Sequence, residues 1–546
     1  MPHIRRSPRG GSLSDAWKGD RTSPGGILRA PSSRERLPSC RTRIPATPGP
    51  TSLPAPHVSP KSKSSLSLAG RDRNSRPYTK IVATIGPTSE DRVGELLAAG
   101  MSIARINFSH GTPEDARRRI AKVRAAAQER MLPVAILADL PGPKMRTGTF
   151  LGGGIDLVER EVVRIRSGEG RAIAGEVLVS VEGLCESVKP GHRIFLADGQ
   201  VEVIAEDVFG DTIQGRVHRA GRVGDRKGVH LPDSAVKYEL PTEEDREWIA
   251  FAKDLSIEFL GLSFVGHARE VETIQDLYKE ASLIAKIERR LAMENLGEIL
   301  EVVDGVMVAR GDLGVELELA QLPLAQKEIL ATAVQAGRFT ITATEMLESM
   351  ITSSRPTRAE VTDVANAVLD GTDAVMLSAE TAVGEHPVAA VEQMAGIALA
   401  VEGSSRYNRR PRLKLNPNDA SFYNAAAMAA VHLANALHLK RILVFTETGN
   451  TARLISRYRP DAEIVALSPE PSTVARMCAL AHVRPILFRR EPSLEDMIHM
   501  ASEMLRLRGV CEEGEEIVVV AGVPPGVAKS TNVMKLHRIG EEVKFH

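Results

Sequence analysis

Eight short apolar segments alternate with stretches of helical pattern from Tyr78 onward. The segments are residues 80–85, 102–108, 134–139, 259–265, 283–288, 305–309, 339–344 and 374–378. Continuous apolar strands that alternate with helices indicate parallel strands buried on both faces, and eight such units make a (β/α)₈ TIM barrel. The sequence therefore predicts an α/β barrel, with a doubly wound open sheet as the alternative fold.

Polar side chains stand at or just beyond the carboxyl ends of these segments, which is where a TIM barrel carries out its chemistry. They are Arg105, Asn107, Asp139, Lys286, Glu288, Asp312 and Thr344. The barrel explains why residues so far apart in the sequence would converge.

Three of these residues form the candidate centre. Lys286 and Glu288 lie two residues apart in one strand, so their side chains point to the same side. Asp312 follows the next strand, after the turn at Gly311. Two carboxylates with open positions suit Mg²⁺, and an ammonium beside them would neutralise charge on a transferring phosphoryl group. A buried salt bridge between Lys286 and Glu288 is the alternative interpretation.

The third barrel unit is interrupted, because about 90 residues after Arg146 carry no helical pattern until Pro241. Strand-like stretches at 161–166, 193–196 and 200–205, separated by turns, predict a small inserted β domain. Such a domain over the barrel mouth would be a lid that excludes water, or a passive insertion. Its two suggestive stretches are Leu196-Ala-Asp-Gly and Arg226-Lys-Gly-Val-His-Leu-Pro, and Lys227 in the second would reach the mouth.

A separate α/β segment begins after Pro411, with a predicted helix at 422–437 and a strand at 441–445. A hydroxyl-rich turn follows, in which the candidate anion-binding residues are Thr446, Thr448, Gly449, Asn450 and Thr451. A turn of this kind at a helix amino terminus presents free amides and the helix dipole to an anion. Helix capping by Thr448 or Thr451 is the alternative. A second loop, residues 522–532, would close over the same site.

The first 76 residues differ from the rest, with 15 Lys and Arg against 4 Asp and Glu and many prolines. We expect this tail to be disordered, because it has too little apolar surface to offset the entropy of ordering. Its prolines oppose the amphipathic helix of an organelle transit peptide. No apolar core region follows Arg5 and Arg6, so a secretory signal is not expected either, and we predict a cytoplasmic protein.

The remainder of the chain holds 55 Lys and Arg against 66 Asp and Glu, which argues against a nucleic-acid surface. No uninterrupted run of about 18 apolar residues predicts a transmembrane helix. The four cysteines, Cys40, Cys185, Cys478 and Cys511, are far apart and lack metal-ligand or disulfide spacing.

Several long motifs follow one another between residue 79 and residue 540. They are Thr79-Lys-Ile-Val-Ala-Thr-Ile-Gly-Pro, Ala104-Arg-Ile-Asn-Phe-Ser-His-Gly, Ala285-Lys-Ile-Glu, Ala309-Arg-Gly-Asp-Leu-Gly-Val-Glu, Met346-Leu-Glu-Ser-Met and Pro356-Thr-Arg-Ala-Glu-Val-Thr-Asp-Val-Ala-Asn-Ala. In this order they resemble the motifs of pyruvate kinases. The resemblance implies a barrel with an inserted β lid and a carboxyl-terminal effector domain. It also implies transfer of phosphoryl from phosphoenolpyruvate to ADP, the last step of glycolysis.

The resemblance assigns roles to individual residues. Glu288 and Asp312 look like the ligands of Mg²⁺, with Mn²⁺ as an alternative ion. Lys286 resembles the lysine that stabilises the transferring phosphoryl group. Arg105 resembles the phosphate-binding arginine, since its planar fork of donors suits phosphate oxygens.

The same resemblance places the substrate carboxylate at the amides of Gly311 and Asp312, with Thr344. The Thr344 hydroxyl lies where the family's proton relay to the enolate runs. The positions that meet the nucleotide match Asn107, His110, Arg146 and Lys227.

One departure from the family concerns K⁺. Many members have Thr-Lys in place of Leu140-Pro141 and Glu in place of Lys144, and they bind K⁺ through residues matching Asn107, Ser109 and Asp139, beside position 140. A fixed ammonium on Lys144 supplies the same charge, so we expect K⁺ not to be required.

The resemblance also implies a homotetramer and an effector that is a sugar phosphate or a nucleotide. Glu447 in the anion loop would disfavour a second phosphate, which favours a singly phosphorylated effector over a bisphosphate.

The expected divisions are a tail at 1–76, barrel segments at 77–146 and 238–405, a β lid at 147–237 and an effector domain at 411–546. Two other functions compete with the kinase. A Mg²⁺-dependent lyase or aldolase acting on 2-oxo acids would need no nucleotide, and a catalytically dead sugar-phosphate sensor would have lost Lys286, Glu288, Asp312 or Thr344.

Overall fold

The structure is a computed structural model that describes residues 76–234, 236, 239–408, 413, 421–523 and 531–543. The tail predicted for residues 1–76 lies outside the described residues apart from Arg76, and so does most of the loop 522–532.

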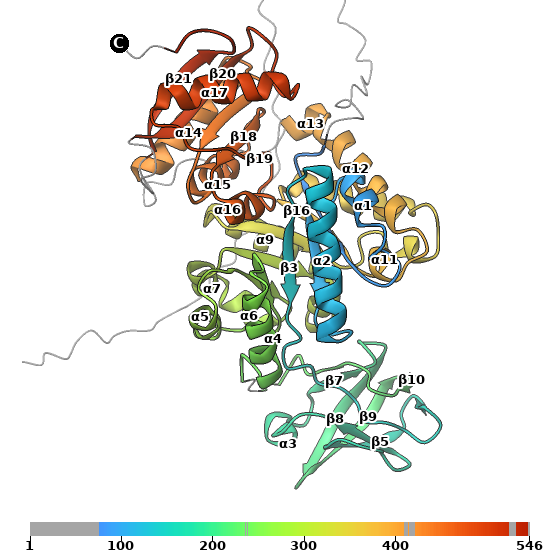
Figure 1. Cartoon of the computed structure of the whole chain (residues 1–546). Coiled ribbons are helices and arrows are strands. Elements are labelled where there is room, and N and C mark those ends of the chain that lie inside the picture. The colour runs from blue at the N-terminus through green and yellow to red at the C-terminus, as the bar shows by residue number, and fades with distance from the viewer. Residues whose placement is uncertain are drawn as a thin grey trace, which may run out of the picture. The chain divides into compact units, whose positions relative to one another are not determined.

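Eight parallel strands form a closed barrel, as predicted, which excludes the open sheet (Figure 1). They are β1 (Lys80–Thr84), β2 (Ile103–Asn107), β3 (Ala135–Asp139), β12 (Phe259–Leu262), β13 (Ser282–Ile287), β14 (Gly305–Ala309), β15 (Phe339–Ala343) and β16 (Ala374–Leu377). Their order around the barrel is β1-β16-β15-β14-β13-β12-β3-β2. Because all neighbours are parallel, every carboxyl end lies on one rim; Asn107 and Asp139, for example, are register partners.

Alternate residues of the barrel strands pack in opposite directions. Ile81 and Ala83 of β1 belong to the apolar cluster that includes the surrounding helices, whereas Val82 between them packs with residues such as Met307. Phe259 and Phe339 meet edge to face, with ring centroids 5.5 Å apart. Burial on both faces is the reason that these strands appear as unbroken apolar runs in the sequence.

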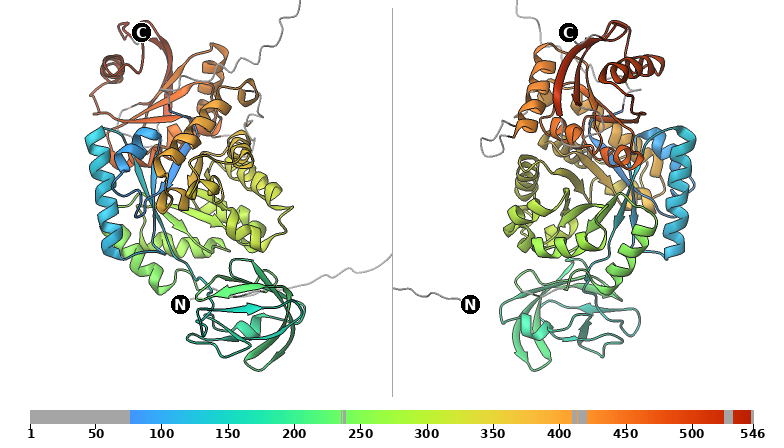
Figure 2. Two further views of the ribbon diagram at one scale, coloured as in Figure 1. Left: turned by 90° about the vertical axis from the view of Figure 1, so that its right-hand side faces the viewer. Right: turned by 60° about the vertical axis from the view of Figure 1, so that its left-hand side comes forward.

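Helices connect and surround the strands (Figures 1 and 2). They are α1 (Val93–Ala99), α2 (Pro113–Arg130), α4 (Glu243–Asp254), α5 (Ala268–Leu277), α6 (Arg290–Glu294), α7 (Leu296–Val302), α8 (Arg310–Glu316), α9 (Leu322–Gln335), the 3₁₀ turn η1 (Glu348–Ile351), α10 (Arg358–Asp370), α11 (Ala379–Ala382), α12 (Pro387–Glu402) and α13 (Ser405–Asn408). Threonine capping boxes begin three of them, at Thr112, Thr242 and Thr357, where the threonine hydroxyl accepts the third amide and a carboxylate returns to the cap amide.

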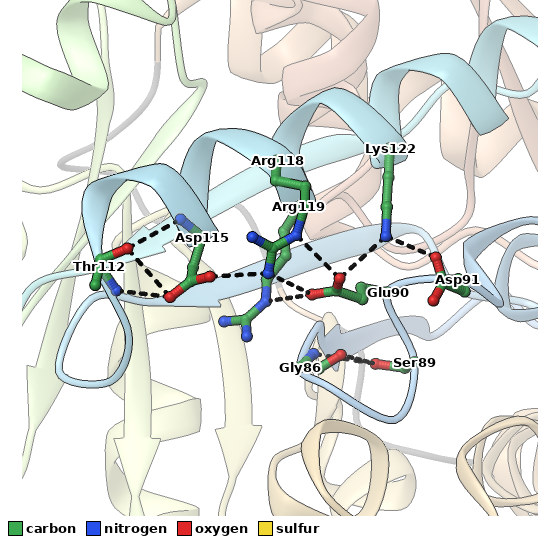
Figure 3. A network of polar contacts seen from close by, with 9 residues as sticks. All are labelled: Gly86, Ser89, Glu90, Asp91, Thr112, Asp115, Arg118, Arg119 and Lys122. Carbon is green, nitrogen blue, oxygen red and sulfur yellow. Dashed lines mark hydrogen bonds and ion pairs between the residues drawn. The ribbon is translucent and has the colours of Figure 1, made fainter.

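A cluster of charges fastens the loop between β1 and α1 to helix α2 (Figure 3). The Glu90 carboxylate lies 3.1 Å from Arg118, 3.0 Å from Arg119 and 3.0 Å from Lys122. Lys122 also pairs with Asp91 at 2.6 Å. The hydrogen bond from Arg118, followed by those from the other two cations, lowers the pKa of Glu90 to about 2. We call these five residues the Glu90 cluster.

The segment between β3 and α4 is a β-rich insertion, as predicted. Its elements are β4 (Gly154–Leu157), β5 (Val162–Ser167), β6 (Glu176–Val179), α3 (Leu184–Ser187), β7 (Arg193–Leu196), β8 (Val201–Phe209), β9 (Thr212–Arg219), β10 (Gly221–Gly224) and β11 (Val229–His230). Six strands form one sheet in the order β11-β7-β8-β9-β5-β6, and β10 pairs with β4. The insertion has its own apolar core, which includes Val163, Ile165 and Val203. The short helix α3 was not predicted.

The carboxyl-terminal segment is an α/β domain, as predicted. It comprises α14 (Phe422–Ala436), β17 (Arg441–Phe445), α15 (Asn450–Arg457), β18 (Glu463–Ser468), α16 (Pro471–Met477), β19 (Val483–Leu487), α17 (Leu494–Leu507), β20 (Glu516–Gly522) and β21 (Thr531–Arg538). The sheet order is β19-β18-β17-β20-β21, with β21 antiparallel to its neighbour.

Among the helices of the described ranges, none combines the length and apolar character needed to cross a bilayer.

Candidate active site

A cavity of about 290 Å³ lies at the carboxyl ends of the barrel strands and is also lined by residues of the β insertion. We call it the barrel-mouth cavity. The predicted site residues that line it are Arg105, Asp139, Lys144, Arg146, Lys227, Lys286, Glu288, Asp312 and Thr344. The residues proposed for the metal and the phosphoryl group therefore converge, although β2, β3, β13, β14 and β15 supply them from separate parts of the chain.

Lys286 contacts three polar side chains around the cavity. Its Nζ lies 2.7 Å from Oε1 of Glu288 and 3.4 Å from Oδ1 of Asp139, and it donates to Oγ of Ser263 at 2.8 Å. Burial by itself would lower the pKa of Lys286, but the two carboxylates, with Asp312 beyond, raise it above its ordinary value. The lysine therefore carries a fixed positive charge.

Glu288 is almost fully buried, with 1% of its surface exposed. Its Oε2 accepts the Phe264 N–H at 2.8 Å, whereas Oε1 makes an ion pair with Lys286 but no hydrogen bond of good geometry. Burial, reinforced by Asp312, raises the pKa of Glu288 even though Lys286 opposes the shift. One carboxylate oxygen thus has unused capacity as an acceptor or ligand.

Asp312 lies in α8 and lines the same cavity. The described part of the chain contains no group of three or more His, Cys, Asp or Glu side chains arranged to hold a metal ion. Glu288 and Asp312 are thus a pair of oxygen donors, which suits a hard cation that keeps water or substrate oxygens as its other ligands.

Arg105 binds Oδ2 of Asp139, the carboxylate oxygen other than the one that pairs with Lys286. Its Nε donates to Oδ2 of Asp139 at 2.8 Å, and Nη1 donates to the Thr84 hydroxyl at 2.9 Å. Burial would raise the pKa of Asp139, but Lys286 and Arg105 together hold it below its ordinary value. Asp139 therefore fixes the positions of two cations at the cavity.

Thr344 follows β15 directly and has an unusual backbone φ of +64°. Its hydroxyl accepts the Gly311 N–H at 2.8 Å and donates to the carbonyl of Ala343 at 2.7 Å. The Gly311 amide, expected from the sequence to hold a substrate carboxylate, is therefore bonded to Thr344 in this structure.

Lys144 contacts one of the residues predicted to bind a monovalent cation, Ser109. Its Nζ donates to Oγ of Ser109 at 2.7 Å, and the Ser109 amide donates to Oδ1 of Asn107 at 3.1 Å. Burial and the nearby charge of Lys286 lower the pKa of Lys144, against the pull of Asp139. Leu140, the fourth predicted residue, is buried in the apolar core and does not line the cavity.

The residues predicted to meet the nucleotide are only partly brought together. Arg146 and Lys227 line the barrel-mouth cavity, whereas Asn107 and His110 do not. Partial burial, with Lys144, Arg146 and Arg105 near it, lowers the pKa of His110.

Sequence reasoning missed several residues of the site. Ser263 and Phe264 contact Lys286 and Glu288, and they follow β12 at its carboxyl end, so the strand-end rule alone would have found them. Asp198 and His230 also line the cavity from the β insertion. They lie in the stretches 196–199 and 226–232 that the sequence singles out, although only Lys227 was expected at the mouth.

The predicted anion loop joins β17 to α15. The Thr446 hydroxyl accepts the Gly449 N–H at 3.0 Å, and Gly449 has a φ of +82°. Gly449 is the cap of α15 and no side chain caps it, so the alternative of capping by Thr448 or Thr451 is wrong. Thr451 instead pairs with the Thr531 hydroxyl at 2.7 Å.

Glu447 in this loop lies 2.6 Å from Arg490. The sequence-based preference for a singly phosphorylated effector assumed an uncompensated Glu447 carboxylate, and this pairing weakens that reason.

Two arginines of α15 contact the end of α9. Arg453 donates to the Gly337 carbonyl and, at 2.8 Å, to Oδ1 of Asn450; Arg457 donates to the Gln335 carbonyl at 2.5 Å. Cations are favourable at a helix carboxyl terminus, where carbonyls lack partners within the helix. These bonds join the helix after the anion loop to the turn that precedes β15.

Comparison with known proteins gives one consistent result. Two family models match the chain, described as "Pyruvate kinase, barrel domain" over residues 76–391 and "Pyruvate kinase, alpha/beta domain" over residues 424–537. Curated pyruvate kinases of Staphylococcus aureus strains USA300, NCTC 8325 / PS 47 and COL are each 38% identical to it over 474 residues. These matches cover 85% of this chain and 81% of each relative.

Proposed function

The chain belongs to the pyruvate kinase family and is an enzyme of that family, and from this premise we propose that the barrel-mouth cavity performs the reaction. Phosphoryl passes from phosphoenolpyruvate to ADP, giving ATP and an enolate that takes up a proton to become pyruvate. The observation that carries the proposal is the buried ammonium of Lys286, 2.7 Å from Glu288 and on the same cavity as Asp312 and Arg105.

Each residue has a distinct part in this proposal. Lys286 and Arg105 bind the phosphoryl oxygens and neutralise the charge that spreads over them during transfer. Their positions are fixed in advance by Asp139, so little reorganisation is needed at the moment of reaction. The Thr344 hydroxyl is the group from which a proton reaches the enolate carbon.

We assign the magnesium ligands to Glu288 and Asp312. The residues fit this ion, because both supply oxygen donors and Oε1 of Glu288 is buried without a hydrogen bond of good geometry. When bound, Mg²⁺ (or Mn²⁺) supplies positive charge to phosphate and substrate oxygens.

We also propose that K⁺ is not required. The support is the Lys144 ammonium, which donates to Ser109 and lies within electrostatic reach of Asp139, two of the residues expected to bind K⁺. A fixed charge there replaces that of the ion.

Regulation by a phosphorylated sugar or nucleotide at the 446–451 loop is part of the proposal, as are a homotetramer and a cytoplasmic location. The loop is supported by the Thr446–Gly449 turn at the start of α15. Preference for a singly phosphorylated effector stays a prediction that titration with glucose 6-phosphate, AMP and fructose 1,6-bisphosphate would test.

The competing lyase or aldolase has no use for a nucleotide. The cations Arg146 and Lys227 line the same cavity as the carboxylates Glu288 and Asp312, which favours a site that also holds ADP phosphates.

The decisive experiment measures ATP formed from phosphoenolpyruvate, ADP and Mg²⁺, with either K⁺ or tetramethylammonium as the monovalent cation. Lys286→Met should abolish ATP formation, whereas Lys279→Met, which changes an exposed lysine (71% exposed), should not. A wild-type protein that forms no ATP under either condition would refute the proposed reaction. ATP formation with K⁺ but not with tetramethylammonium would refute only the proposed K⁺ independence.

A further inference from the structure

Thr344 adopts a conformation that its residue type disfavours. Its φ is +64°, and that of the following Glu345 is +52°. A β-branched side chain rarely occupies this left-handed region, and it stays there only where surrounding contacts hold it. Thr344 also lines the barrel-mouth cavity, and its hydroxyl supplies the proton in the proposed reaction. The groups that hold its backbone therefore bear on the reaction.

Arg310 supplies most of these contacts. Its Nε lies 3.1 Å from the Ala343 carbonyl and 3.2 Å from the Thr344 carbonyl, and its Nη2 donates to the same Thr344 carbonyl at 2.5 Å. The planar fork of a guanidinium thus spans two successive carbonyls at the end of β15. Arg310 is the first residue of α8, so the Gly311 amide next to it reaches the Thr344 hydroxyl at 2.8 Å.

Arg310 is itself buried and oriented. It is 7% exposed, and its Nη1 lies 2.6 Å from Oδ2 of Asp363 in α10. It does not line the barrel-mouth cavity, whereas Thr344 does. Arg310 therefore contacts the backbone of the site without being placed to contact a substrate.

We propose that Arg310 is a positioning residue for the proton transfer step, and this inference rests on the proposed function. The guanidinium holds the 343–345 turn in its left-handed form, and that form directs the Thr344 hydroxyl toward Gly311 and the cavity. Without Arg310 the turn relaxes toward ordinary φ values and the hydroxyl moves away from the enolate. Asp363 acts indirectly, because its carboxylate orients the guanidinium of Arg310.

The test separates proton transfer from phosphoryl transfer. The full-length enzyme is assayed for ATP formation and, separately, for exchange of the pyruvate methyl protons with deuterium in D₂O, followed by NMR in the presence of ATP and Mg²⁺. Arg310→Lys keeps the charge but cannot span both carbonyls. We expect it to lower the exchange rate by about 10- to 100-fold and the kcat of ATP formation by a smaller factor, with less than about a 3-fold change in KM for phosphoenolpyruvate.

Arg338→Gln is the matched control. Arg338 also donates to two main-chain carbonyls, those of Leu300 and Glu301, but lies at the opposite end of β15. It should leave the exchange rate within about 2-fold of wild type, since it has no contact with the Thr344 turn. A loss of exchange in Arg338→Gln equal to that in Arg310→Lys would overturn the inference, because it would reflect general destabilisation.

Two further variants keep the inference falsifiable if Arg310→Lys folds poorly. Asp363→Asn should lower exchange in the same direction by a smaller factor. Combining Arg310→Lys with Thr344→Ser should be less than additive, since serine tolerates the relaxed turn better. Wild-type exchange in Arg310→Lys, or strict additivity, overturns the inference while leaving the kinase function intact; absence of ATP formation by the wild type instead refutes the proposed function.

Discussion

The ammonium of Lys144 donates to the hydroxyl of Ser109 at 2.7 Å. The Ser109 amide in turn donates to Asn107, and Asp139 is close enough to act on the charge of Lys144. The lysine therefore lies near three of the residues expected to coordinate K⁺. This arrangement leads to the first prediction.

Lys144→Gln should make the enzyme dependent on K⁺. The variant loses the fixed charge, so we expect activity in tetramethylammonium to fall by about 100-fold and K⁺ to restore part of it. The check is kcat measured in both salts at equal ionic strength. Unchanged K⁺-free activity of the variant would contradict this prediction.

Wild-type activity should also fall on the alkaline side at a pH below the ordinary lysine value of 10.5, because burial lowers the pKa of Lys144.

Glu288→Gln and Asp312→Asn should separate metal affinity from stability. Both should weaken Mn²⁺ binding by at least about 10-fold, measured by electron paramagnetic resonance. Glu288→Gln also breaks a buried ion pair with Lys286 and should cost about 3 kcal/mol of unfolding free energy. Asp312 makes no ion pair among the described residues, so Asp312→Asn should cost less than about 1 kcal/mol. Undiminished Mn²⁺ binding in both variants would exclude this site.

The Glu90 cluster should contribute stability that depends on pH. Because Arg118 and its neighbours depress the pKa of Glu90 to about 2, the contribution is present above the ordinary value of 4.5 and is lost as the pH falls toward 2. Glu90→Gln should therefore lower the unfolding free energy by about 1.5 kcal/mol at pH 7 and by less at pH 3. Glu95→Gln, which removes an exposed pair with Arg92, is the control. If the difference in unfolding free energy between wild type and Glu90→Gln were the same at pH 7 and pH 3, the charge of Glu90 would not contribute to stability.

Arg453→Lys should uncouple the anion loop from the barrel. Lysine cannot bridge the Gly337 carbonyl and Asn450 as the guanidinium does. We expect unchanged kcat without effector and at least about a 5-fold smaller effector-induced shift in the phosphoenolpyruvate concentration at half-maximal rate. The probes are glucose 6-phosphate, AMP and fructose 1,6-bisphosphate, each tested separately. A full response in the variant to the effector that acts on the wild type would refute the coupling.

The barrel and its catalytic rim were predictable because their signals are local. Lys286 and Glu288 had to share a face because they are two residues apart in a strand, and the strand-end rule located Asp139 and Thr344 without any contact information. The β insertion was recognised from the absence of helical pattern and from short strand-like stretches. Neither signal predicted α3 or showed that Asp198 would line the cavity.

The anion loop illustrates the limit of such reasoning. Thr451 is of a residue type that often caps helices, yet its hydroxyl pairs with that of Thr531, 80 residues further along the chain. No local pattern shows whether the Thr451 hydroxyl will bond to a backbone amide at the helix start or to a distant hydroxyl, because either partner satisfies it.

The sequence by itself determined the number of barrel units, the rim on which chemistry occurs and the carboxylates and ammonium placed there, since periodicity and spacing are properties of neighbouring residues. Only the tertiary structure decided that Lys144 meets Ser109, that Oε1 of Glu288 lacks a hydrogen bond, and that Arg310 holds Thr344 in a left-handed turn. Those relationships depend on how the closed barrel brings separate strand ends within hydrogen-bonding distance, and that distance is not encoded in any single segment.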